Sequence, residues 1–271
     1  MVLILIGLII GILIGTGCYV LEMVWWGALL MVLTGLPIAI GTMFLVAIIT
    51  YPFNRKVEYV IKPKKIYGFF IYLAVDFLKV LLRFKIKVEG LEKIKNLQGY
   101  QLVINHQAMS DPFILLCMIK RTDFSFMIKK EILNLKIIGT WMKMAGYYAI
   151  DRKNNRQGLV AMLHAIDAIK HERPIGIFVE GTRSKGPEMG PFHDGSFKMA
   201  QKAHSPLVVC VIDGTYKFKK NYPWRKTKVF FKVCEVIDYE DIKDLKTNEI
   251  SDFVFKHMQD ALDEYRNRNL G

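Results

Sequence analysis

YQLVINHQAMSDP, residues 100–112, is the stretch that decides the fold of this chain. Its first six residues are rich in the apolar side chains of a buried strand, whereas Asp111 and Pro112 are typical of a helix start. An Asp there accepts hydrogen bonds from free backbone N–H groups, and the fixed φ of a Pro suits the first helical turn. The segment therefore predicts a strand that turns sharply into a helix, with His106 in the loop between them.

Outward from this stretch, short β-rich runs alternate with segments of helical periodicity. The strand candidates are KIKVEGL (85–91), YQLVIN (100–105), FSFMI (124–128), YYAI (147–150), PIGIFV (174–179), PLVVCVI (206–212) and TKVFFKVCEVI (227–237). The helical segments are 112–121, 131–145, 156–172, 196–204 and 248–268. Helices that alternate with strands form crossover connections, so we expect an α/β fold with a mostly parallel sheet flanked by helices on both faces.

The first 51 residues form an apolar segment in which Glu22 is the only charged side chain. The stretches 2–21 and 23–51 are each long enough for a helix that crosses a bilayer, which needs about 20 residues. One straight helix would be much longer than the hydrocarbon is thick, so we expect a membrane-anchoring hydrophobic helical hairpin over residues 1–52. Glycines and a proline in the second arm leave open whether it crosses the bilayer or re-enters it.

Positive charge is concentrated after this segment. The formal net charge of +13 suits an anionic lipid surface, a phosphate-bearing ligand or nucleic acid. Lysines and arginines close to an apolar segment stay in the cytoplasm, so we expect the rest of the chain on the cytoplasmic side of a cell membrane. Residues 53–84 are expected to form a basic linker and an amphipathic helix, which lies in the membrane interface or packs on the domain's own core. Residues 85–271 are expected to form one domain.

The four cysteines do not indicate a disulfide framework or a zinc site. Cys18, Cys117, Cys210 and Cys234 are widely spaced and form no C-x-x-C pair. Because such frameworks need closer spacing or a histidine at ligand distance, we expect reduced cysteines and no metal.

Polar residues follow the ends of two predicted strands, where the ligand crevice of an open α/β sheet lies. After YQLVIN, His106 is placed to take a proton from a hydroxyl as a general base, with Asp111 fixing the ring and stabilising its charged form. After PIGIFV, the segment 180–183, EGTR, combines a glycine that lets the backbone approach a ligand with an arginine that can grip phosphate. A lone His-x4-Asp pattern also fits a structural loop histidine beside a helix cap, but two such strand ends favour a functional site.

These motifs resemble those of the glycerolipid acyltransferases typified by 1-acylglycerol-3-phosphate acyltransferase. The resemblance covers roughly residues 85–235, and four motifs carry it in order along the chain: N-H-Q-A-M-S-D, Y-Y-A-I-D-R, F-V-E-G-T-R-S and S-P-L-V-V-C-V-I. The stretch M-I-K-K-E-I is also similar to the family's. Ala108 stands where the family often has Ser, and Val209 where it often has a second Pro, which concerns acceptor or acyl preference more than the type of reaction.

The resemblance implies both the roles of residues and a reaction. It identifies His106 and Asp111 as a catalytic dyad. The residues that it implies in substrate binding are Asn105, Lys129, Arg152, Glu180, Gly181, Thr182, Arg183 and Pro206. It implies transfer of a fatty acyl group from acyl-CoA or acyl carrier protein to lysophosphatidic acid, giving phosphatidic acid without a cofactor or metal. Glycerol 3-phosphate or another lysophospholipid is the alternative acceptor, and a basic membrane-anchored lipid-binding module is the alternative outside the enzymes.

Two further groups of residues are weaker candidates for a functional site. His193 and Asp194 are adjacent in sequence, and their surroundings indicate a turn. The basic and aromatic residues of segment 216–228 suit nucleic acid, anionic membrane lipid or the phosphates of coenzyme A, and they also fit a solvated hairpin without a ligand. Beside an apolar N-terminal segment we favour anionic lipid, and we expect no nucleic acid partner.

Overall fold

The computed structural model describes residues 59–151 and 155–268 and, before them, only positions 9, 13, 45, 48, 49 and 51. Apart from those positions, the predicted hairpin of residues 1–52 lies outside the described residues, as does Arg152. Within the part that is described, no helix is both long enough and apolar enough to cross a membrane.

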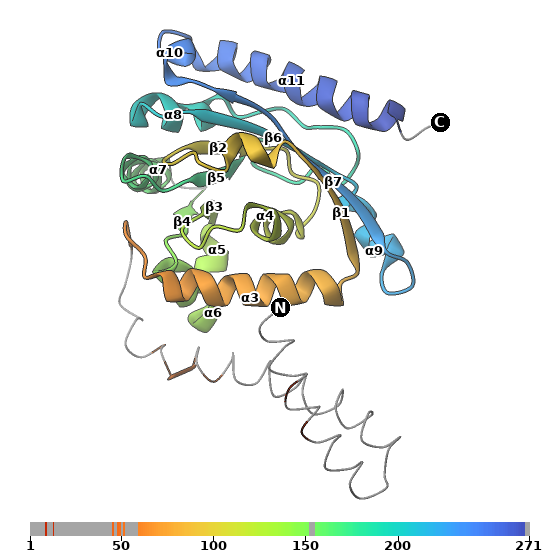
Figure 1. Cartoon of the computed structure of the whole chain (residues 1–271). Helices are drawn as coiled ribbons and strands as arrows, with labels where there is room; N and C mark the ends of the chain where they lie inside the picture. The colour runs from red at the N-terminus through yellow and green to blue at the C-terminus, as the bar shows by residue number, and fades with distance from the viewer. Residues whose placement is uncertain are drawn as a thin grey trace, which may run out of the picture.

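A seven-stranded sheet forms the middle layer, in the order β1-β7-β6-β2-β5-β3-β4 (Figure 1). The strands are β1 (Phe84–Glu89), β2 (Gln101–Ile104), β3 (Ser125–Lys129), β4 (Tyr148–Ile150), β5 (Ile175–Phe178), β6 (Leu207–Asp213) and β7 (Thr227–Ile237). All neighbours pair in parallel except β6 and β7. The seven predicted strands and the mostly parallel sheet are thus confirmed.

The register of the parallel strands brings distant segments to one edge of the sheet. Ile104 of β2 pairs with Phe178 of β5 on one side and with Cys210 of β6 on the other. The loops that follow β2, β5 and β6 therefore leave the sheet at the same level. This carboxyl edge holds the candidate site.

Helices cover both faces of the sheet (Figure 1). On one side lie α3 (Lys65–Leu81), α4 (Asp111–Ile119), α5 (Lys130–Leu133) and α6 (Lys136–Met144). On the other side lie α7 (Asn155–Lys170), α8 (Lys198–Ala203), α10 (Tyr239–Ile242) and α11 (Thr247–Arg268). The short α9 (Phe218–Asn221) precedes β7.

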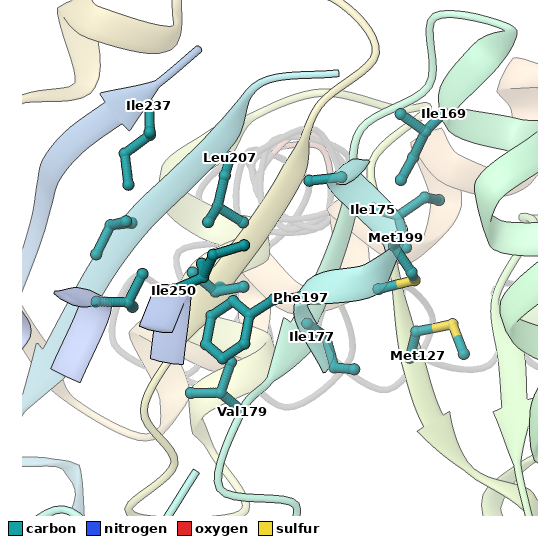
Figure 2. Close-up of a cluster of buried hydrophobic side chains, with 14 of the residues drawn as sticks. Met127, Ile169, Ile175, Ile177, Val179, Phe197, Met199, Leu207, Ile237 and Ile250 are labelled. Carbon is teal, nitrogen blue, oxygen red and sulfur yellow. The ribbon is translucent and has the colours of Figure 1, made fainter. Parts of the chain in front are cut away.

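Two hydrophobic cores result from the alternation of side chains along the strands. Leu102 and Ile104 of β2 point into the core beneath α3 and α4, whereas Val103 between them points into the opposite core. Figure 2 shows this second core, where Ile175, Ile177 and Val179 from β5 and its end meet other apolar side chains. Both faces of the central strands are buried, which explains their continuous apolar runs.

The predicted helix 131–145 is wrong in one respect, because the structure divides it into α5 and α6. Leu135 adopts an extended conformation between them. A Cβ added at Gly139 would lie only 2.2 Å from the carbonyl oxygen of Leu133. The break thus permits a close backbone contact that helical periodicity does not reveal.

Helix α3 packs on α4, which is one of the two arrangements that the sequence left open. It buries Tyr67, Gly68, Leu73 and Val75. A Cβ at Gly68 would lie 1.9 Å from the carbonyl oxygen of Thr122. The helix therefore approaches the domain backbone more closely than any larger residue would allow.

Replacing Gly68 with Ala is predicted to destabilise the domain, because the added methyl group forces α3 away from Thr122. Overpacking of this kind costs about 1–3 kcal/mol. The midpoint of thermal unfolding of the full chain in detergent measures the effect. Gly195→Ala is the matched control, since a Cβ there has no atom within 4 Å, and it should leave the midpoint unchanged. Equal midpoints for the two variants would contradict the tight packing of α3.

Candidate active site

His106 and Asp111 form a hydrogen-bonded pair at the carboxyl end of β2. The imidazole Nδ1 lies 2.8 Å from Asp111 Oδ2. The Asp111 side chain is fully buried and that of His106 is 16 % exposed. No described residue hydrogen-bonds Nε2, so this nitrogen is available to a substrate. A carboxylate bonded to one nitrogen of the imidazole, with the other nitrogen open to a substrate, is the arrangement typical of a histidine that acts as a general base.

The loop between the two residues is closed by the same carboxylate. Asp111 Oδ2 also accepts hydrogen bonds from the backbone N–H groups of Gln107, at 2.6 Å, and Ala108, at 2.8 Å. The sequence predicted Asp111 as the helix cap, but α4 begins at Asp111 itself and Ser110 is the cap residue. The carboxylate thus folds back over the loop and fixes the backbone that carries His106.

The His106 ring also stacks on Phe178, the last residue of β5, with the ring centroids 4.1 Å apart. Phe178 is packed against the core beneath α4. Stacking on one side and the Asp111 bond at Nδ1 leave the imidazole little freedom. Both contacts come from the sheet edge, so the ring's position depends on the register of β2 and β5.

Glu180 binds the backbone of both loops at this edge. Its Oε1 accepts a hydrogen bond from the N–H of His106 at 2.6 Å, and its Oε2 accepts one from the N–H of Gly190 at 2.7 Å. Burial raises the pKa of this carboxyl, and the two N–H donors act in the opposite direction. Because both oxygens are in use, the structure assigns Glu180 to holding the loops. Its predicted contact with a substrate phosphate stays a prediction.

The rest of the EGTR segment faces outward beside His106. Gly181 has a φ of +63°, a conformation that favours glycine, and a Cβ there would lie 2.7 Å from Nε2 of the exposed His193 ring, which would have to move. The Ser184 N–H donates to the carbonyl of His106 at 2.8 Å. Thr182 and Arg183 are exposed. No hydrogen bond or ion pair to a described residue holds the Arg183 guanidinium, which leaves it free to bind an anion.

The other predicted site residues are less closely gathered. Lys129 ends β3 at the same edge and is half exposed, with an ion pair to Glu131 at 3.1 Å. Asn105 exchanges two hydrogen bonds with the backbone of Ile212, at 2.9 and 2.8 Å, which joins β2 to β6. Its role in the structure is therefore to hold the strand ends together.

Pro206 lies at the amino ends of the parallel strands, whereas His106 lies at their carboxyl ends. It precedes β6, and its carbonyl accepts a hydrogen bond from the N–H of Gln101 at the start of β2. About five strand residues, roughly 16 Å, separate this level from His106. Pro206 precedes the start of β6, whereas His106 follows the end of the parallel strand β2. The structure therefore does not bring Pro206 to the site.

Two residues of this edge were missed in the sequence. Gln107 donates from Nε2 to Oδ1 of Asp213 at 2.9 Å, and both side chains are buried. Asp213 ends β6, directly after the run PLVVCVI. The rule that strand ends carry functional residues would have identified Asp213 had it been applied to this strand.

Among the residues that the structure describes, no three His, Cys, Asp or Glu side chains are grouped in a way that could hold a metal ion. Cys117 and Cys210 are buried free thiols in the cores, and burial raises the pKa of both. The expectation that no metal takes part stays a prediction.

Comparison with known proteins matches part of this chain to a family. Residues 85–213 match the family described as Acyltransferase. The 1-acyl-sn-glycerol-3-phosphate acyltransferase of Saccharomyces cerevisiae is 27 % identical over 69 % of this chain and 63 % of its own length. That of Bacillus subtilis is 28 % identical over 64 % of this chain and 84 % of its own length. The chain thus spans less than two thirds of the yeast relative.

A solved structure shows the same fold. The crystal structure of the 1-acyl-sn-glycerophosphate acyltransferase of Thermotoga maritima superposes with a TM-score of 0.61, at 22 % identity, over 73 % of this chain and 79 % of that one. At this identity the likeness concerns the fold. It agrees with the α/β architecture predicted from the strand and helix pattern.

Replacing Glu180 with Gln is predicted to destabilise the site. One of the two acceptor oxygens becomes an NH2 group that faces a backbone N–H, which leaves a buried donor unsatisfied and costs about 1–3 kcal/mol. Denaturant unfolding of the purified chain measures the loss. Glu188→Gln, in the same loop but with a side chain 78 % exposed, should change the unfolding free energy by less than about 0.5 kcal/mol. A similar result for both variants would show that the Glu180 bonds do not stabilise the loops.

Proposed function

We propose that this chain, whose residues 85–213 match the family described as Acyltransferase, transfers a fatty acyl group from an acyl thioester to the free hydroxyl of 1-acyl-sn-glycerol 3-phosphate, giving phosphatidic acid. The observation that carries this proposal is the His106–Asp111 pair with its open Nε2 beside an exposed arginine. Curated relatives with this reaction in their names support the choice of acceptor.

The proposed chemistry needs one base. Nε2 of His106 removes the proton of the acceptor hydroxyl as its oxygen attacks the thioester carbonyl carbon. The new C–O bond forms, the C–S bond breaks, and the thiolate leaves with the proton from the imidazolium. Asp111 stabilises the imidazolium through Nδ1 and keeps Nε2 toward the substrate. No covalent enzyme intermediate is required, because the acceptor itself is the nucleophile.

Positioning of the acceptor phosphate is assigned to Arg183, with Lys129 as a second cation. Arg183 is exposed on the loop whose Ser184 N–H bonds the carbonyl of His106. The backbone next to Arg183 is therefore hydrogen-bonded to the backbone of the base. A planar guanidinium can bind two phosphate oxygens at once. Lys129 would exchange its surface pair with Glu131 for the phosphate, which costs little because both side chains are exposed.

The donor is proposed to be acyl-CoA or acyl carrier protein. Glycerol 3-phosphate or another lysophospholipid is the alternative acceptor, since each offers a hydroxyl near a phosphate. A basic lipid-binding module without activity is the alternative of another class. The buried carboxylate held against a histidine argues against that alternative, because binding a headgroup does not require a base.

We further propose that the domain acts on an anionic membrane surface at the cytoplasmic side. Exposed apolar side chains of α3 include Ile66, Phe69, Val80 and Leu81. The turn after α9 presents Trp224, 85 % exposed, between Tyr222 and Arg225. Basic side chains, all exposed, surround that turn: Lys217, Lys219, Lys220, Lys226 and Lys228. Aromatic and basic residues together suit the headgroup region of anionic lipid.

The turn and α3 are held next to each other. Nη1 of Arg83, just after α3, donates to the carbonyl of Pro223 at 3.0 Å. The backbone carbonyl of Arg83 accepts a hydrogen bond from Thr227 at 3.2 Å. The C-terminal end of α3, with exposed Val80 and Leu81, thus lies beside the turn that carries Trp224, and α3 follows the apolar N-terminal segment in the chain. This continuity supports lipid as the partner of the surface.

Replacing His106 with Ala is predicted to lower kcat by about a thousandfold or more, because the hydroxyl loses its base. The assay follows labelled acyl groups from acyl-CoA and from acyl carrier protein to lysophosphatidic acid, glycerol 3-phosphate and lysophosphatidylcholine. His171→Ala is the control, because His171 forms a surface pair with Asp167 at 3.5 Å and should keep wild-type activity. Activity retained by the His106 variant would refute the dyad. A wild type that transfers acyl groups to none of the acceptors would favour the binding module.

Trp224 is predicted to contact lipid. In a full-length variant with Phe at 25, 26 and 141, Trp224 is the only tryptophan, and brominated lipids in phosphatidylglycerol vesicles should quench its emission strongly. A variant that keeps only Trp141 is the control, because this side chain is 7 % exposed and should be quenched much less. Equal quenching of the two tryptophans would place the turn away from the membrane.

A further inference from the structure

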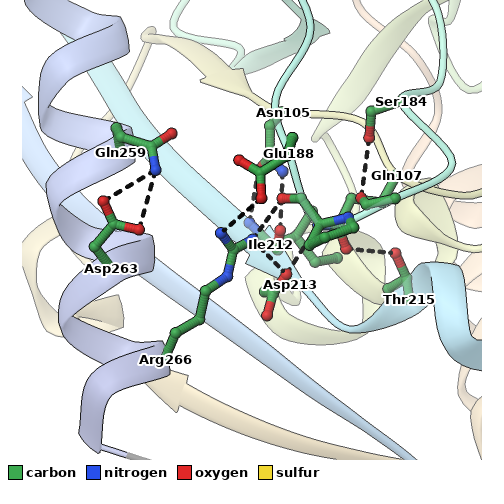
Figure 3. A network of polar contacts seen from close by, with 12 residues as sticks. Asn105, Gln107, Ser184, Glu188, Ile212, Asp213, Thr215, Gln259, Asp263 and Arg266 are labelled. Carbon is green, nitrogen blue, oxygen red and sulfur yellow. Dashed lines mark hydrogen bonds and ion pairs between the residues drawn. The ribbon is translucent and has the colours of Figure 1, made fainter.

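A partly buried chain of polar contacts connects the C-terminal helix to the candidate base. Nη2 of Arg266, on α11, lies 3.1 Å from Oδ1 of Asp213 (Figure 3). The same oxygen accepts the 2.9 Å hydrogen bond from Nε2 of Gln107. The N–H of Gln107 in turn bonds the carboxylate of Asp111, which holds His106. Four contacts therefore lead from the last turns of the chain to the imidazole.

Arg266 also contacts the second loop of the site. Its Nη2 donates to the carbonyl of Pro187 at 2.5 Å, and its Nη1 lies 3.9 Å from a carboxylate oxygen of Glu188 (Figure 3). Both residues belong to the loop that follows the EGTR segment and ends at Gly190, where Glu180 binds the backbone. One guanidinium thus joins the end of β6 to the loop after β5.

The helix that carries Arg266 is fixed on the sheet. Tyr265 stacks on Phe230 of β7 with the ring centroids 3.8 Å apart and the planes 2° from parallel. Val254, Met258 and Leu262 of the same helix are completely buried in the second core. The guanidinium is therefore delivered by a rigid element, and its partner Asp213 has a side chain only 9 % exposed.

We propose that Arg266 is a positioning residue for the His106–Asp111 pair. By binding Asp213 and Pro187 together, it fixes the loop after β2 relative to the loop after β5, and so fixes the base relative to the phosphate-binding arginine. The proposal rests on the acyl transfer proposed above. Arg266 lies outside residues 85–213, so the match to the family does not assign it. Small displacements of a base from its substrate lower rates strongly, which is why such a clamp has an effect.

Two substitutions of Arg266 by side chains of similar length test this positioning role. Arg266→Met removes the charge and the donors, and it should lower kcat about tenfold while the Michaelis constants of acceptor and donor change less than about twofold. Arg266→Lys should recover kcat to within about threefold of wild type, because Nη2 alone makes both short contacts and an ammonium group can replace it. Unchanged kcat in Arg266→Met, or equal losses in both variants, would overturn the proposal.

Arg268→Ala is the matched control from the same helix. Its guanidinium pairs with Glu89 and Glu264 at 3.3 and 3.7 Å, on a partly exposed surface away from Asp213. This variant should keep the wild-type kcat. A tenfold loss in Arg268→Ala as well would show that α11 matters through stability alone, which overturns the specific role of Arg266.

Hydrogen–deuterium exchange separates this proposal from the proposed function, because it needs no substrate. Arg266→Met should raise exchange at the backbone amides of residues 105–111 and 181–190, and Arg268→Ala should not. Raised exchange with an inactive wild type would leave the clamp intact and refute acyl transfer. Wild-type exchange in Arg266→Met with an active wild type would refute the clamp alone.

Discussion

The 2.6 Å hydrogen bond from the N–H of His106 to the carboxylate of Glu180 is the interaction on which the site depends. It joins the loop after β2 to the loop after β5, and the second carboxylate oxygen extends the contact to Gly190. Because Glu180 is buried, the loss of either bond would leave a buried carboxylate oxygen without that partner. The parallel register of β2 and β5 makes this bond possible, since it brings both loops to one level.

The polar side chains of the site have two different roles. Glu180 and Asp111 bind backbone amides, and Asn105 joins β2 to β6, so these polar side chains hold the loops. Within the described part of the chain, no hydrogen bond or ion pair holds Nε2 of His106 or the guanidinium of Arg183, so these groups can meet a substrate. The structure thus separates residues that hold the loops from residues that can meet a substrate, although the two kinds are neighbours in the motifs.

The chain supports its site from both faces of the sheet. Phe178, packed on the core beneath α4, carries the imidazole ring, while Arg266 reaches the same edge from α11 on the opposite face. In the proposed function, the apolar side of α3 and the turn at Trp224 would set this edge relative to a lipid surface.

The sequence by itself determined the strands, most helices and the His106–Asp111 pair, because period, caps and spacing act over a few residues. It did not reveal the division of α5 from α6, which depends on the contact of Gly139 with Leu133. The placement of Pro206 at the far edge, the amide bonds of Glu180 and the reach of Arg266 were decided by tertiary structure alone. These features depend on strand order and register, which bring together residues far apart in the sequence, such as Asn105 and Ile212, 107 positions apart, whereas local sequence patterns extend over only a few residues.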